Sequence, residues 1–65
     1  MVSIERTKAV KTIHERISYL LALSRFEGTA CRFAIQDGDT ERARNHAVWA
    51  ARQARAAMAL LASIA

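Results

Sequence analysis

Proline is absent from this chain of 65 residues, and glycine occurs only twice, at Gly28 and Gly38. These residues most often interrupt regular structure, so few breaks are expected. The single Cys31 excludes a disulfide framework and suits a reducing compartment, and His14 and His46 are too scattered for a metal site. We therefore expect no metal and no cofactor. Because one core of this size rarely supplies more than about 3 to 5 kcal/mol, oligomerisation must supplement it, and we expect a homodimer.

Long uncharged runs are also missing. The longest covers residues 56–65, roughly half the length of a membrane span. The N-terminal residues carry charges of both signs and no apolar segment, so no secretory signal is expected. The sequence predicts a soluble, cytoplasmic protein without a membrane partner. The alanine- and arginine-rich composition suits a small bacterial or phage accessory protein.

One loop signal stands out, at residues 37–39. Gly38 can adopt the left-handed conformation that ends a helix, and Asp39 or Thr40 can cap the next one. Ser3 with Glu5 marks the first helix start. The pattern predicts one all-α domain over residues 1–65, an antiparallel hairpin with helices over 3–36 and 39–64. We expect the first helix to continue through Gly28, at a cost of about 1 kcal/mol.

Alanine dominates the second half, and a seam of apolar residues recurs there at alternating steps of four and three. A helix with small residues in its seam permits close approach of its neighbour. Folding about residue 38 sets Ile64 near Val10 and Ala54 near Leu20 or Leu21. The predicted seam comprises Ala43, Ala47, Ala50, Ala54, Ala57, Leu61 and Ile64.

The first helix carries two apolar stripes, and a helix that is apolar on two sides has two neighbours. The first stripe comprises Val10, Ile13, Ile17, Leu20, Ser24, Gly28, Cys31 and Ile35. The second comprises Tyr19, Leu23, Phe26, Ala30 and Phe33. One hairpin covers only the first stripe. We favour a second subunit over the aromatic stripe, giving a four-helix bundle; the alternative is an exposed groove that recognises a target protein.

Acidic residues do not occur after Glu41, although the second helix carries four arginines. Their counter-ions must come from Glu15 or Glu27 of another helix, from solvent or from a ligand. Trp49 shares a helix face with several of these arginines, and both residue types are enriched in binding hot spots. The alternative is that Trp49 covers the flank of the bundle. The predicted partner-binding residues are Arg42, Asn45, Trp49, Arg52 and Arg55.

Catalytic signatures are lacking: there is no phosphate-binding glycine loop, no HExxH, no CxxC and no paired carboxylates. Two helices with an alanine seam also leave little volume for a pocket, so we expect no enzyme and no small-molecule substrate. Cys31 points into the predicted core, where thiols behave as inert hydrophobic groups. A Cys2His2 site formed by Cys31 and His46 of two subunits is disfavoured, because no ligand spacing supports it.

Two functional classes remain. The favoured one is a homodimeric adaptor, regulator or inhibitor that binds a larger protein through its helix surfaces. The alternative is a nucleic-acid-binding regulator, with phosphate contacts from the arginines of the second helix together with Arg6, Lys8 and Lys11. The expected architecture looks like that of the Rop-type RNA-binding dimers, which also join two helical hairpins; no residue motif of that family is matched. A structural subunit of a larger assembly is a further alternative.

Overall fold

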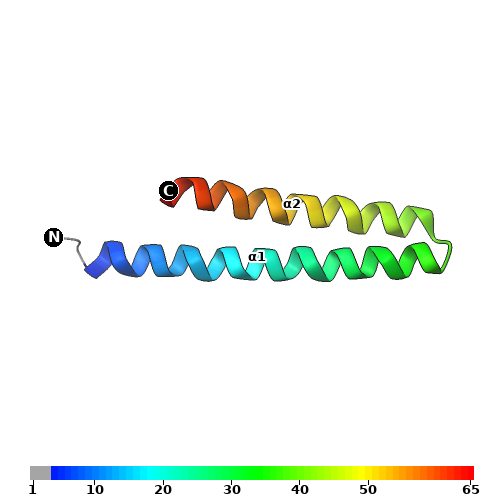
Figure 1. The fold of residues 1–65 in the computed structure, drawn as a ribbon, viewed down its shortest axis with the longest axis horizontal. Helices are drawn as coiled ribbons and strands as arrows, with labels where there is room; N and C mark the ends of the chain where they lie inside the picture. Colours follow the sequence, from blue (N-terminus) through cyan, green and yellow to red (C-terminus); the bar gives the residue numbers. More distant parts are fainter. Residues whose placement is uncertain (1–3) are drawn as a thin grey trace.

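Two helices form the whole architecture of the described chain. The computed structural model describes the backbone of residues 4–65 and the side chains of residues 10–65. Helix α1 (Ile4–Gln36) and helix α2 (Thr40–Ile64) pack side by side as an antiparallel hairpin 56 Å long (Figure 1). The expected helical hairpin is confirmed. Ser3, where the first helix was expected to start, and the side chains of Glu5, Arg6 and Lys8 lie outside the described residues.

The two helices differ in length, and the longer one projects beyond the hairpin. The N-terminal turns of α1 extend past the end of α2 (Figure 1). Gly28 does not interrupt α1, so the continuous first helix is also confirmed.

The turn between the helices follows from three residues. Gly38 has φ +75°, and its N–H donates to the Ile35 carbonyl while the Asp39 N–H donates to the Ala34 carbonyl. This pair of hydrogen bonds is a Schellman motif, which ends α1 with glycine in its left-handed position. The Asp39 side chain then caps α2 by accepting from the Arg42 N–H at 3.0 Å. Both cap residues expected from the sequence are confirmed.

The core of the single hairpin is very small. Its buried apolar residues are Ile17, Ala34, Ala43 and Ala57, and no large side chain of the described part is fully buried. Because each buried methyl group contributes only about 0.8 kcal/mol, three buried alanines stabilise the hairpin weakly. The hairpin therefore has little hydrophobic stabilisation as an isolated chain.

The seam of α2 is rotated relative to the sequence prediction. Ala47 and Leu61, which were placed in the seam, are exposed, and Leu60 is more buried than Leu61. The observed seam keeps Ala43, Ala50, Ala57 and Ile64 and runs through His46, Gln53 and Leu60. Ala54 stays half-buried at its edge. This change corresponds to a turn of roughly 50° about the helix axis, half the 100° between successive residues. The apolar pattern of the sequence did not predict this rotation, because two of the residues that face α1, His46 and Gln53, are polar.

The seam of α1 needs one correction at its loop end. Ala34 is completely buried and Ile35 is 64% exposed, so the first stripe ends at Ala34 instead of Ile35. The Schellman turn explains the difference, because it places α2 against Ala34.

Polar groups link the two helices within the seam. The Ser24 hydroxyl donates to the Ala50 carbonyl at 2.9 Å, and His46 Nδ1 lies 2.6 Å from Glu27 Oε2. In both pairs the residue numbers add up to 73 or 74. The expected pairs have nearly the same sums, 74 for Ile64 with Val10 and 74 or 75 for Ala54 with Leu20 or Leu21. The predicted register of the hairpin agrees with these two contacts.

Candidate interaction surfaces

The hairpin has two broad faces, one on each side of the seam. On one of them, Arg16 and Leu20 of α1 and Ala56, Ala59 and Leu60 of α2 line an open hollow of about 440 Å³. Arg16 and Ala56 therefore lie on the same side of the hairpin. Since residues seven apart share a side of a helix packed in this way, positions 23 and 30 of α1 and 49 and 42 of α2 belong to this side too.

The aromatic face, as we call this side, unites two sets of residues that the sequence analysis had treated separately. Tyr19, Phe26 and Phe33 follow one another at steps of seven, and they are 59–67% exposed. Leu23 and Ala30 lie between this row and the seam and are half-buried. Trp49 is 49% exposed and comes from α2 on the same side. A molecule that covers the aromatic stripe would therefore cover Trp49 as well.

Trp49 is held by a neighbouring cation. The guanidinium carbon of Arg52 lies 5.2 Å from the centroid of the Trp49 ring, within the range of a cation–π interaction. Asn45 is exposed beside them on the outer edge of the aromatic face. Arg55 is exposed but points away from this face, because it is three residues beyond Arg52 and opposite the seam. Of the predicted partner-binding set, Arg55 is thus separated from the others.

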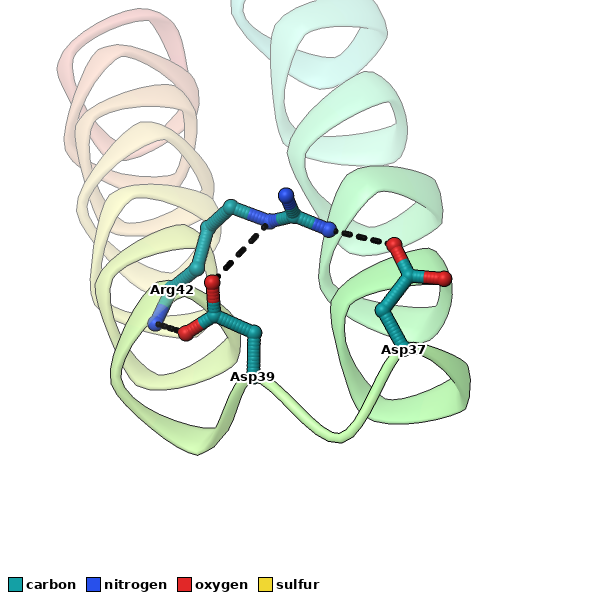
Figure 2. Close-up of polar contacts among 3 residues, drawn as sticks. All are labelled: Asp37, Asp39 and Arg42. Carbon is teal, nitrogen blue, oxygen red and sulfur yellow. Dashed lines mark hydrogen bonds and ion pairs between the residues drawn. The ribbon is translucent and has the colours of Figure 1, made fainter.

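Arg42 forms ion pairs with two carboxylates at the loop end of the hairpin. Figure 2 shows its guanidinium reaching across from α2 to the carboxylate of Asp37, with a distance of 2.7 Å. A second carboxylate, that of Asp39, lies 3.9 Å from Nε of Arg42. Both pairs are about half exposed, so each contributes at most about 1 kcal/mol. The side chain of Arg42 braces the turn and is partly neutralised there.

The opposite side, which we call the aliphatic face, is also apolar. Its positions lie next to the seam on each helix, and its larger side chains Leu21, Ile35 and Leu61 are 47–64% exposed. An added Cβ at Gly28 meets no atom within 4 Å, so the space above Gly28 is open. The aliphatic face consists of Leu21, Gly28, Ile35, Ala47, Ala54 and Leu61. The apolar pattern did not predict this surface, because it placed all of these residues except Leu21 in the seams.

The cations that border the aliphatic face form no ion pairs among the described side chains. Among the side chains of residues 10–65, no carboxylate forms an ion pair with Lys11, Arg25, Arg32 or Arg44. Glu27, one of the two counter-ions expected for the arginines, contacts His46 instead. The carboxylates that form ion pairs with an arginine are those of Asp37 and Asp39 at the loop, and both pair with Arg42.

Clusters of metal ligands and membrane-spanning segments are absent from the described part of the chain. No group of three or more histidine, cysteine, aspartate or glutamate side chains there could hold a metal ion. Cys31 is a half-buried free thiol, and His46 contacts Glu27. Neither described helix has a stretch long and apolar enough to cross a bilayer.

The fold and its surfaces define a helical hairpin with two exposed apolar faces. No protein-family model matches the chain, and comparisons with curated proteins and with solved structures found no significant match.

Proposed function

We propose that this chain is a non-enzymatic, homodimeric helical interaction protein that binds a larger protein as an adaptor, regulator or inhibitor. In this proposal a second copy covers the aromatic face and completes a four-helix bundle. The observation that carries it is the contrast between a core of four buried residues, three of them alanine, and the exposure of Tyr19, Phe26, Phe33 and Trp49. Large exposed apolar patches mark interaction sites in soluble proteins.

The area of the aromatic face supports self-association. At the observed exposures, the four aromatic side chains present roughly 500 Å² of surface per chain, if each whole side chain accounts for about 200 Å². Two copies packed on this face would bury roughly 1,000 Å² from these side chains alone, which reaches the lower range of specific interfaces. The surrounding Leu23 and Ala30 would add to this area.

The shape of the aromatic face supports a symmetric contact. Phe33 protrudes on one side of Phe26, and the hollow beside Arg16 and Ala56 lies on the other. Phe33 lies about 10.5 Å from Phe26 along the helix, and Leu20 and Arg16, which line the hollow, lie about 9 and 15 Å from it in the other direction. A two-fold axis beside Phe26 would therefore bring Phe33 of each copy to the hollow of the other, as an isologous interface requires. In this arrangement Trp49 belongs to the interface between subunits.

Cysteine cross-linking tests this assignment of the second copy. In a Cys31→Ser background, Phe26→Cys should form a covalent dimer under mild oxidation, because the two thiols meet near the axis. Val48→Cys is the matched control, since Val48 is 46% exposed on the outer side of α2. Cross-linking of both variants to the same extent, or of the Val48 variant alone, would contradict the proposed interface.

The second candidate function is nucleic-acid binding by a dimer of Rop-like architecture. The observation that favours it is the set of cations that form no ion pair among the described side chains: Lys11, Arg16, Arg25, Arg32, Arg44, Arg52 and Arg55. Phosphate contacts by such residues would give an affinity that falls steeply with salt. A labelled RNA hairpin titrated at two salt concentrations decides between the classes: absence of binding at low salt eliminates this candidate.

A further inference from the structure

A second apolar surface remains uncovered when the aromatic face is occupied by another copy. The aliphatic face lies on the other side of the seam, so that the proposed dimer would expose one such face on each subunit. Its larger side chains, Leu21, Ile35 and Leu61, are about half exposed or more. The question is what kind of molecule would cover it.

The charges around the aliphatic face exclude a second copy as the best occupant. Arg25 and Arg32 border it on α1, and Arg44 borders it on α2. The described acidic side chains lie elsewhere: Glu27 is in the seam with His46, and the loop carboxylates hold Arg42. Glu15 and Glu41 are exposed on the outer sides of the two helices, opposite the seam. Two copies joined through this face would bring cations together without any acid between them. Like charges across an interface disfavour association.

Small residues in the middle of the aliphatic face leave room for a helix to approach. Gly28 and Ala47 are small and come from opposite helices at about the same level of the hairpin, since their numbers add up to 75. The space above Gly28 is open, so an approaching helix could come close to the backbone. A phosphate backbone has no apolar groups with which to cover Leu21 and Ile35, and for this reason a protein helix fits better than a nucleic acid.

We propose that the aliphatic face binds an acidic amphipathic helix of another protein. Its apolar side covers Leu21, Gly28 and Ile35, and its flanking carboxylates pair with Arg25, Arg32 and Arg44. The two arginines of α1 are seven residues apart, about 10.5 Å along the axis, and carboxylates spaced by seven residues on the partner would match them. This inference rests on the proposed function, because it specifies the chemistry of the protein that the dimer binds.

Two synthetic helical peptides test the proposal. Both have 21 residues and the same leucine and alanine face, but one carries glutamate at the flanking positions and the other carries lysine. The full chain should bind the glutamate peptide and not the lysine peptide. Arg32→Glu should weaken binding of the glutamate peptide at least fivefold and should permit binding of the lysine peptide. Arg55→Glu makes the same charge change on the outer side of α2 and should alter affinity less than twofold.

Enlarging Gly28 in the middle of the aliphatic face provides a second test. Gly28→Leu should weaken binding of the glutamate peptide at least fivefold, whereas Ala22→Leu, an exposed position of α1 opposite the seam, should not. Equal effects of Arg32→Glu and Arg55→Glu, or binding of an RNA hairpin in place of the glutamate peptide, would overturn the proposal.

Sedimentation of the same samples separates the two claims. A dimer that binds neither peptide contradicts only the assignment of the aliphatic face. A monomer at every concentration contradicts the proposed function. In that case the peptide titration still tests binding at the aliphatic face, because it does not require a dimer.

Discussion

His46 of α2 contacts Glu27 of α1 in the middle of the seam, with Nδ1 and Oε2 2.6 Å apart. Less than one third of either side chain is exposed. The remaining seam positions nearby are small, and the Ser24 hydroxyl bonds to the Ala50 carbonyl one turn away. A shift of one helix along the other would separate both polar pairs. These contacts therefore favour one register over others that the alanines alone would tolerate.

A double-mutant cycle tests the Glu27–His46 contact. Glu27→Ala, His46→Ala and the combined variant should show a coupling free energy of about 0.5 to 1 kcal/mol, because the pair is only partly withdrawn from water. The measurement is urea denaturation followed by circular dichroism at a fixed protein concentration. Strict additivity of the two single changes would show that the contact does not stabilise the fold.

Alanines inside and outside the observed seam should respond differently to enlargement. Ala57 is fully buried, so Ala57→Leu should destabilise the protein by about 1 to 3 kcal/mol through overpacking. Ala62 is exposed, and Ala62→Leu should change the free energy of unfolding by less than about 0.5 kcal/mol. Thermal unfolding of both variants measures this difference. A higher melting temperature for Ala57→Leu would contradict close packing at this position.

The two glycines should respond in opposite directions to the same substitution. Gly28→Ala should stabilise α1 by about 0.5 to 1 kcal/mol, since a Cβ meets no neighbour and alanine favours the helix. Gly38→Ala should destabilise the turn by about 1 to 2 kcal/mol, because φ is +75° there. Chemical denaturation of the two variants provides the comparison. A destabilising Gly28→Ala would indicate that something packs closely on Gly28 in the assembled protein.

Trp49 is the single tryptophan of the chain and reports on the aromatic face. If a second copy covers this face, the emission maximum should move to shorter wavelength as the protein concentration rises through the dimerisation range. Quenching by acrylamide should weaken in parallel, because the ring becomes less accessible to solvent. Emission and quenching that do not change while sedimentation shows dimer formation would place Trp49 outside the interface.

The turn could be predicted residue by residue, whereas the rotation of the helices could not. Gly38 and Asp39 act through their own backbone preferences, which depend on neighbours in sequence and are therefore legible without the structure. The position of His46 in the seam depends on Glu27, 19 residues away, and a search for apolar repeats does not detect such a pair. The union of Trp49 with the aromatic stripe likewise required knowledge of which flanks of the two helices lie together.

Sedimentation equilibrium of the wild-type chain and two matched variants tests the central claim most directly. Phe26→Asp places a charge on the aromatic face, and Val48→Asp places the same charge on the outer side of α2. We expect the wild type and the Val48 variant to be dimers at micromolar concentration, and the Phe26 variant to be a monomer with reduced helicity. A wild-type chain that is a stable, fully helical monomer under these conditions would contradict this expectation.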